Sequence, residues 1–345
     1  MKDSNQAIFD NAIDFLEKSL EEFKDSPKYS ILHFAIAVEI LLKARLAIEH
    51  WSLVVQKNAN KTNYLKGDFK SVNLDEAVKR LRDIVGEHVS EAEHQSFKKI
   101  AAHRNKVIHF YHGEINSDKE STQLQQIVKE QCECWYHLKT FFTKKWHTHF
   151  TDHLDHFNSL DWKMKQHWEY LSTVFEQKKP ELEKHRKLGK IVGTCTYCSF
   201  ESVPFEEYFP EISNGRCLVC EWVNTLLTLE CECGQPIIFQ NEPWQTCQFC
   251  NKKYEPEDVY ALIYEFGYDG SEWPDCITPA NCKNCDGYHT VAAMHDKYFC
   301  TSCFELFESV GECGWCNEYC TGNLEYSYYK GCAVCEGKMG WDGDN

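Results

Sequence analysis

The sequence lacks any apolar run long enough to cross a membrane. A membrane-spanning helix needs about 20 consecutive, mainly apolar residues, whereas the most apolar stretch, residues 31–42, is interrupted by His33 and Glu39. The first residues, Met-Lys-Asp-Ser-Asn, also lack the basic segment followed by an apolar segment that marks a secretory signal. We therefore expect no membrane partner and a cytoplasmic location.

Basic residues are scarce in the second part of the chain. Residues 191–345 contain 7 Lys and Arg against 25 Asp and Glu, a formal charge of −18, whereas residues 1–190 carry +2. Nucleic-acid affinity comes largely from basic side chains that neutralise phosphates. This acidic part is therefore not expected to bind nucleic acid over most of its surface. A length of 345 residues with 43% hydrophobic content is typical of a globular protein with more than one domain.

Cysteine, in contrast, is abundant, with 20 residues. Because the cytosol keeps thiols reduced, metal binding explains these residues better than disulfides do. Sixteen of them form eight close pairs: Cys195/Cys198, Cys217/Cys220, Cys231/Cys233, Cys247/Cys250, Cys282/Cys285, Cys300/Cys303, Cys313/Cys316 and Cys332/Cys335. A Cys-x-x-Cys pair places two thiolates on one tight turn, which is half of a tetrahedral zinc site.

The spacing of the pairs predicts four zinc sites built from successive pairs. Within the four units, 18, 13, 14 and 15 residues separate the two pairs, the length of a short hairpin, and the units are separated by 10, 31 and 9 residues. This pattern is typical of tandem zinc ribbons or treble clefs with about four structural zinc ions per chain. An interleaved arrangement of the RING type is disfavoured by the ten-residue separation. Four thiolates fill the tetrahedron, so no catalytic metal is expected.

Residues 1–190 have the apolar periodicity of an all-α region. The expected helices cover about residues 4–26, 28–56, 73–86, 90–113 and 121–150. Ser90 and Glu93 form a capping box at the start of the fourth. The four cysteines outside the pairs, Cys132, Cys134, Cys276 and Cys320, are expected to be free structural thiols.

One helical segment carries a recognisable motif. Residues 102–110 have the sequence Ala-His-Arg-Asn-Lys-Val-Ile-His-Phe, and Arg104, Asn105 and His109 resemble the Arg-Asn-x-x-x-His signature of the HEPN superfamily. Residues 37–44, with Glu39, resemble the second helix of that family and its inward acidic residue. The resemblance covers about residues 1–155. It implies a small helical domain, an RNA substrate, metal-independent endoribonuclease activity in defence or toxicity, and a homodimer formed through the helical domain.

The residue types suit this chemistry. RNA cleavage without a metal uses the neighbouring 2′-hydroxyl as nucleophile, and His109 is suited to take its proton near neutral pH. Arg104 can stabilise the charge that develops on the phosphate, and the resemblance implies that Asn105 orients the groups. Residues five apart on a helix are separated by about 140°, so Arg104 and His109 do not share a face. The dimer that the resemblance implies would solve this by bringing two copies of the segment together. The bare Arg and His spacing also occurs by chance at Arg45 and His50.

Several alternatives remain open at the level of sequence. Glu39 either positions Arg104 or His109, or pairs only with Lys43 on its own helix. The histidines between His147 and His156 either bind a metal on one helix face or belong to a solvated helix. The whole chain is either a ribonuclease or a non-catalytic dimeric adaptor whose zinc units bind a protein or nucleic-acid partner. The acidic array is expected to bind a protein or to make a self-inhibitory contact.

The predicted fold class is therefore an α+β multidomain protein. An N-terminal all-α bundle of the HEPN type covers residues 1–155, and a charged helical linker covers residues 156–190. Two pairs of small zinc-ribbon or treble-clef units, each with four cysteine ligands, cover residues 191–252 and 281–345. A linker over residues 253–280 joins the two pairs.

Overall fold

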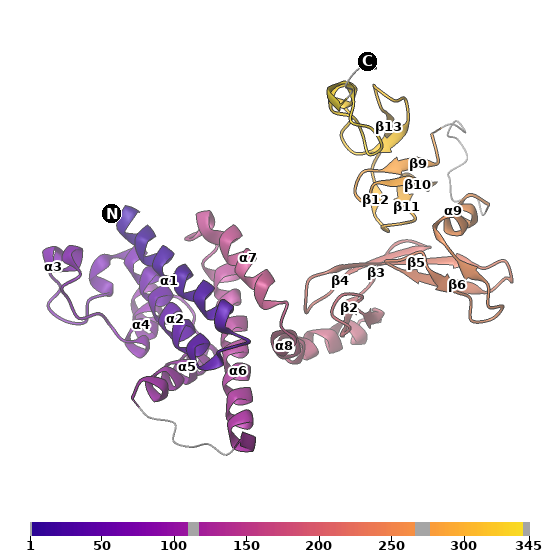
Figure 1. Ribbon diagram of the computed structural model, residues 1–345. Coiled ribbons are helices and arrows are strands. Elements are labelled where there is room, and N and C mark those ends of the chain that lie inside the picture. Colours follow the sequence, from indigo (N-terminus) through magenta and orange to yellow (C-terminus); the bar gives the residue numbers. More distant parts are fainter. Residues whose placement is uncertain (1, 110–116, 266–276, 341–345) are drawn as a thin grey trace. The chain divides into compact units, whose positions relative to one another are not determined.

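The computed structural model describes residues 2–109, 117–265 and 277–340. The chain divides into two compact units, Met1–Lys178 and Lys179–Asn345. The first unit is helical and the second contains all the described strands (Figure 1), which is the predicted α+β layout. Within the described residues, no helix combines the length and apolarity needed to span a bilayer.

The first unit is built from helices that begin at recognisable sequence signals. They are α1 (Lys2–Glu22), α2 (Pro27–Glu49), α3 (Lys61–Lys66), α4 (Leu74–Arg80), α5 (Glu91–His109), α6 (Ser117–Thr140), α7 (Leu154–Met164) and the first part of α8 (Trp168–Lys187). Proline is the first residue of α2, where its missing N–H costs nothing. The capping box of α5 is confirmed, since Ser90 N donates to Glu93 Oε2 at 2.7 Å and Glu93 N donates to Ser90 Oγ at 3.3 Å.

Aromatic side chains fill the core of the helical unit. Trp135 of α6 stacks between Phe34 of α2 and Phe157 of α7, with ring centroids 5.8 and 5.9 Å apart. All three side chains are fully buried. Burying each one stabilises the fold by roughly 1.5–3 kcal/mol relative to leaving it exposed, so α2, α6 and α7 are joined by a continuous apolar contact.

Three helices end earlier than the sequence predicts. Helix α4 ends at Arg80 rather than near Gly86, because a π-helical turn, Leu81–Val85, follows it. Helix α2 ends at Glu49 rather than near residue 56. The predicted helix over residues 121–150 is wrong in its second part, because α6 ends at Thr140 and a π-helical turn, Phe141–Lys145, follows it. After that turn Trp146 and Phe150 pack back against Phe142, each with ring centroids 5.6 Å apart. This aromatic packing turns the chain where the periodicity alone indicates a continuing helix.

The second unit consists of short strands and a few helices. Its strands are β1 (Val192–Thr194), β2 (Glu201–Pro204), β3 (Glu206–Phe209), β4 (Ile212–Arg216), β5 (Val223–Glu230), β6 (Pro236–Gln240), β7 (Gln245–Thr246), β8 (Lys253–Tyr254), β9 (Ala280–Cys282), β10 (Gly287–Met294), β11 (Lys297–Cys300), β12 (Leu306–Phe307), β13 (Val310–Glu312) and β14 (Tyr319–Thr321). The described α-helices of this unit are the end of α8, α9 (Pro256–Glu265) and α10 (Ser327–Lys330).

Neighbouring cysteine units contribute strands to shared sheets and do not fold as independent domains. Strands β3, β4, β5 and β6 form one antiparallel sheet, in which β5 follows the second cysteine pair and leads to the third. The last two units share a six-stranded sheet of order β12-β11-β10-β9-β14-β13. The parallel pairing of β14 with β9 joins them.

Helix α9 and one apolar cluster connect the two halves of the cysteine-rich unit. Val259, Leu262 and Ile263 of α9 are buried in a cluster that also contains Ile212 of β4 and Phe299 of β11. The stretch predicted as a linker, residues 253–280, thus contains a packed helix. His295 Nε2 also lies 2.7 Å from Glu211 Oε2, adding a polar contact across the same junction.

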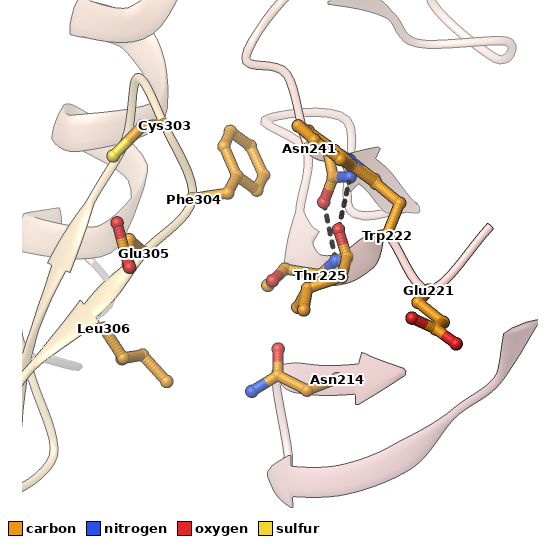
Figure 2. Close-up of a pocket in the computed structure, with 10 residues that line it drawn as sticks. Asn214, Glu221, Trp222, Thr225, Asn241, Cys303, Phe304, Glu305 and Leu306 are labelled. Atoms are coloured by element: carbon orange, nitrogen blue, oxygen red, sulfur yellow. Dashed lines mark hydrogen bonds between the residues drawn. The ribbon is translucent and has the colours of Figure 1, made fainter. Parts of the chain in front are cut away.

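A cavity of about 680 Å³ lies at this junction. Figure 2 shows Phe304 and Leu306 on one side of it, facing Asn214 and Thr225 from the other. Its remaining lining residues are Glu221, Trp222, Val223, Asn241, Cys303 and Glu305. Both walls belong to the same compact unit, so the cavity is part of its architecture.

Candidate metal centres and the Arg-Asn-x-x-x-His motif

The sixteen paired cysteines gather into four groups of four. The groups are Cys195, Cys198, Cys217 and Cys220; Cys231, Cys233, Cys247 and Cys250; Cys282, Cys285, Cys300 and Cys303; and Cys313, Cys316, Cys332 and Cys335. Within each group all four sulfurs lie within 4.8 Å of one another. The grouping is the one that successive pairs predict, and each group can hold one metal ion.

The sulfur geometry fits a four-coordinate metal rather than disulfides. Sulfur–sulfur contacts between pairs are 3.5 Å for Cys195 and Cys220, and 3.6 Å for Cys231 and Cys250. In the third and fourth groups the corresponding distances reach 3.8 and 3.7 Å. A disulfide is about 2.05 Å long, whereas four sulfurs placed tetrahedrally at about 2.3 Å from an ion are about 3.75 Å apart. The donor set therefore matches four structural metal sites.

Most of the cysteine pairs lie on the same backbone turn. In the turns that begin at Cys195, Cys217, Cys247, Cys300 and Cys313, the first cysteine accepts from the N–H four residues later and donates to the carbonyl five residues later. The residue after the second cysteine has a positive φ in all five turns, from 59° to 69°. These residues are Ser199, Glu221, Asn251, Phe304 and Asn317. A non-glycine residue there costs about 1–2 kcal/mol, so the ligand geometry must hold the turn in place.

Hydrogen-bond donors around the sulfurs favour the thiolate form. Val219 N and Cys220 N donate to Cys217 Sγ at 3.3 and 3.4 Å, and Tyr254 Oη donates to Cys231 Sγ at 3.0 Å. Metals bind cysteine as thiolate, so these surroundings prepare the sites for a cation.

The remaining described cysteines lie outside the four groups. Cys132 and Cys134 are fully buried in α6, where desolvation raises the pKa of each thiol. Cys320 is also buried, and Asn281 Nδ2 donates to its sulfur at 3.8 Å. All three are free thiols. Cys276 lies outside the described residues.

The histidines between His147 and His156 do not gather around one point. They lie on several elements, because the chain turns at Trp146 and passes through a 3-10 turn, Thr151–His153, before α7 begins. His153 stacks on Phe9 at 4.1 Å and His156 Nε2 lies 2.9 Å from Glu17 Oε1. Within the described residues no histidine joins a group of metal-binding side chains. His153 and His156 thus each contact a residue of α1.

The predicted motif lies at the C-terminal end of α5, where Arg104 reaches a second helix. Arg104 Nη1 donates to Glu39 Oε2 of α2 at 2.5 Å, and Arg104 Nη2 donates to Asn105 Oδ1 at 3.2 Å. The Arg104 side chain remains 26% exposed. Glu39 and Asn105 thus hold the guanidinium in one orientation while part of it faces solvent.

Glu39 pairs with two cations, because it contacts Arg104 of α5 in addition to Lys43 on its own helix. Lys43 Nζ donates to Glu39 Oε1 at 2.7 Å and to Ser71 Oγ at 2.9 Å. Burial alone raises the pKa of Glu39, but hydrogen bonds and charges from Lys43 and Arg104 outweigh that effect, and the pKa is lowered. Glu39 is therefore a carboxylate at neutral pH that connects α2 to the motif.

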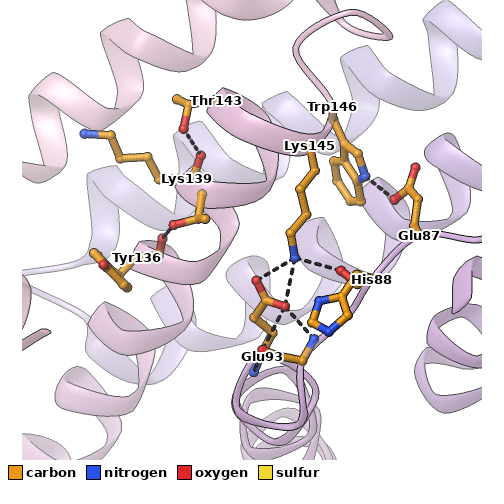
Figure 3. Close-up of polar contacts among 10 residues, drawn as sticks. Glu87, His88, Glu93, Tyr136, Lys139, Thr143, Lys145 and Trp146 are labelled. Carbon is orange, nitrogen blue, oxygen red and sulfur yellow. Dashed lines mark hydrogen bonds and ion pairs between the residues drawn. The ribbon is translucent and has the colours of Figure 1, made fainter.

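The start of α5 is joined to the π-helical turn that follows α6. Lys145 Nζ donates to Glu93 Oε1 and Oε2 at 2.8 and 2.9 Å and to the His88 carbonyl at 2.8 Å (Figure 3). Next to it, Trp146 Nε1 donates to Glu87 Oε2 at 2.6 Å. Glu93 therefore caps α5 and pairs with Lys145 at the same time, which fixes the helix that carries the motif.

Arg104 lies in different surroundings from Arg45, the arginine of the chance Arg and His spacing. His109 is the last residue of α5, and its side chain lies outside the described part of the chain. Arg45, of the Arg45 and His50 spacing, is only 3% exposed and is paired with Glu49 at 2.7 Å and with Glu87 at 2.5 Å. Arg45 is thus a buried structural arginine, unlike the partly exposed Arg104.

A second polar pair on α5 is not indicated by the motif. His103 Nε2 lies 2.5 Å from Glu130 Oε2 of α6. Both residues line a cavity of about 400 Å³ together with Lys99, Ala102, Lys106, Gln126 and Ile127. His103 directly precedes Arg104 in the sequence, so this cavity lies on a neighbouring face of α5.

No protein-family model matches the chain, and no curated protein or solved structure shows significant similarity to it.

Proposed function

We propose that the helical unit is a HEPN-type, metal-independent endoribonuclease and that the second unit is a structural zinc array that binds a partner or regulates the nuclease. The observation that carries the proposal is the anchoring of Arg104. A carboxylate on another helix and the adjacent asparagine amide hold its guanidinium, which stays partly exposed. A preorganised guanidinium of this kind is suited to a phosphate that gains negative charge during reaction.

The chemistry assigned to the motif follows from its side chains. The 2′-oxygen of RNA attacks the adjacent phosphorus as His109 takes the hydroxyl proton, and the bond to the 5′-oxygen breaks. The products are a 2′,3′-cyclic phosphate and a 5′-hydroxyl, which gains a proton as it leaves. Arg104 stabilises the phosphorane through paired hydrogen bonds. Asn105 and Glu39 position Arg104.

A homodimer through the helical unit completes this site. Arg104 and His109 are five residues apart on α5, which separates them by about 140° around the helix axis. Two copies of α5 related by a two-fold axis bring Arg104 of one copy toward His109 of the other. Asn105 and Lys106 are exposed and Ile108 is 55% exposed, so this end of the helix has surface to offer a second copy.

We assign zinc to the four groups of cysteines. All four ligands of each group are thiolates in tetrahedral proximity, and sulfur-only tetrahedral sites are typical of structural zinc. Each site is closed by its four thiolates, so the metal stabilises the fold and takes no part in RNA cleavage.

RNA cleavage with product analysis tests the nuclease. The wild type should cut single-stranded RNA but not DNA, in the presence of EDTA over the assay time, and leave cyclic phosphate ends. Arg104→Ala and His109→Ala should each lose about a hundredfold or more. Arg82→Ala, which removes an exposed arginine outside the motif, should retain activity. Cleavage that needs added magnesium, or that survives both motif substitutions, would falsify the proposal.

A further inference from the structure

The cavity at the junction of the cysteine units combines a buried hydrogen-bond acceptor with negative charge. Asn214 Oδ1 is buried and accepts no hydrogen bond from the described residues. Glu221 and Glu305 also line the cavity, and both side chains are exposed. A buried acceptor without a donor is costly, so the cavity is matched to a ligand that carries hydrogen-bond donors.

The cavity does not suit an anion. Asn241, one of its amides, is already engaged: its Oδ1 accepts from Thr225 N at 2.6 Å, and its Nδ2 donates to Thr196 Oγ1 at 2.9 Å and to the Val223 carbonyl at 3.2 Å. Among the described residues that line the cavity, none is Lys, Arg or His. A phosphate would therefore meet two carboxylates and no cation, which excludes it on charge.

An aromatic surface continues from the mouth of the cavity. Trp222 lines it and is 45% exposed, and Tyr197 stacks on Trp222 with ring centroids 5.4 Å apart and an angle of 20° between the rings. A cation placed over a tryptophan face is attracted by the ring. Tryptophan and tyrosine are also enriched at protein–protein interfaces.

The backbone turns of two metal sites build opposite walls. Glu221 and Phe304 are the positive-φ residues that follow the second cysteine of their turns, and Figure 2 shows them on opposite sides of the cavity. Phe304 is buried in the apolar cluster that joins the two halves of the unit. The distance between the walls is therefore fixed by packing, so the cavity is preformed.

We propose that this cavity binds an arginine side chain of a basic protein segment. A guanidinium has five N–H donors and no acceptor, and it stacks on aromatic rings. Its donors match the acceptors of the lining, which are the carboxylates of Glu221 and Glu305 and the oxygen of Asn214, and its flat face matches the ring of Trp222. The formal charge of −18 on residues 191–345 attracts such a segment from a distance. The inference rests on the proposed partner-binding role of the array and does not depend on RNA cleavage.

Peptide binding to the full-length, zinc-loaded protein tests this assignment. Fluorescence anisotropy would compare a short arginine-containing peptide with the same peptide carrying citrulline, a neutral analogue of similar shape. The arginine peptide should bind at least about tenfold more tightly, and Glu221→Gln, Glu305→Gln and Trp222→Ala should each weaken binding about fivefold or more. Circular dichroism and zinc content should be unchanged, because all three side chains are exposed.

Glu325→Gln is the matched control, since it removes an exposed carboxylate outside the cavity. It should leave the affinity nearly unchanged. The proposal is overturned if citrulline binds as tightly as arginine, if Glu325→Gln weakens binding as much as Glu221→Gln, or if single-stranded RNA competes for the same site. Peptide binding is measured without RNA, so loss of nuclease activity and loss of this site give separate results.

Discussion

Glu39 illustrates how one side chain can join a fold to a motif. It is 18% exposed and holds Lys43 on its own helix and Arg104 on another. Glutamine in its place keeps the shape but leaves two cations without a counter-charge. Glu39 therefore contacts Arg104 through a charge-assisted hydrogen bond.

This arrangement predicts a pH-dependent contribution to stability. The pKa of Glu39 is lowered in the folded state from its ordinary value of 4.5, so its stabilisation is present at neutral pH and is lost as pH falls through the folded pKa. Glu39→Gln should lower the free energy of opening of α2 and α5, as measured by hydrogen exchange, by about 1–3 kcal/mol at neutral pH. The difference from wild type should shrink at lower pH. Hydrogen exchange of the two helices at matched pH measures this.

Glu91→Gln provides the control, because Glu91 is exposed at the start of α5, where it accepts from the amide of Gln95 one turn later. It should leave protection nearly unchanged at both pH values. An equal loss of protection in Glu39→Gln at neutral and at acidic pH would show that the carboxylate charge contributes nothing.

At the residue scale, a side-chain contact could be predicted from the sequence when its two residues are close together in the chain. Ser90 and Glu93 are three residues apart and their capping box forms as predicted. The pairing of Glu39 with Arg104 crosses 65 residues, and sequence alone left it open. Nothing in the sequence distinguishes Asn214, whose unsatisfied oxygen depends entirely on tertiary packing.

At the scale of elements, the repeated cysteine turn is the unit from which the second domain is built. Its two backbone hydrogen bonds and its positive-φ residue recur in five of the described turns. The regular spacing of the cysteines predicted which pairs form each metal site, because each cysteine turn is formed by residues that are close in the sequence. The sharing of sheets was not predictable, since the pairing of β14 with β9 depends on contacts between distant segments.

The positive-φ position gives a direct test of the turn. Asn317 has a φ of 59° in the turn that begins at Cys313. Asn317→Val should destabilise this turn by about 1–2 kcal/mol, because a β-branched residue fits poorly in the left-handed region. Asn317→Gly should be tolerated. Competition with a chromophoric chelator should show one zinc ion released more readily in the valine variant alone, and equal release from both variants would contradict the proposed role of this turn.

Helix α9 begins at ordinary sequence signals, although its segment was predicted as a linker. Pro256 is its first residue, Asp258 Oδ2 accepts from Glu255 N at 2.9 Å, and Val259, Leu262 and Ile263 form its buried face. A proline at the first position, a nearby acidic cap and apolar residues at helical spacing all favour a helix. The predicted helix beyond Thr140, in contrast, is wrong because aromatic packing overrides a helical pattern.

At the scale of the whole molecule, the two units depend on different sources of stability. The first has a core of large buried side chains such as Phe34, Trp135 and Phe157. The second has small sheets joined at four groups of four cysteines. Structural zinc contributes on the order of 10 kcal/mol to the folding of small domains, so removal of the zinc proposed for these groups should affect the two units unequally.

Metal analysis and chelation test whether the two units differ in their dependence on zinc. The purified, desalted protein should contain about four zinc ions per chain, one for each group of cysteines. A strong chelator should then expose residues 179–345 to proteolysis while residues 1–178 remain protected. Half that number of ions or fewer, or simultaneous loss of protection in both units, would contradict the assignment of one structural zinc to each group.

The four thiolate groups also determine how the protein migrates in an electric field. A divalent ion bound by four thiolates carries a formal charge of about −2, whereas four protonated thiols carry none. Filling four such groups therefore moves the formal net charge from −16 to about −24. The metal-loaded chain, although it has gained cations, should run faster toward the anode on a native gel than the reduced, metal-free chain. Intermediate bands would then report partial loading.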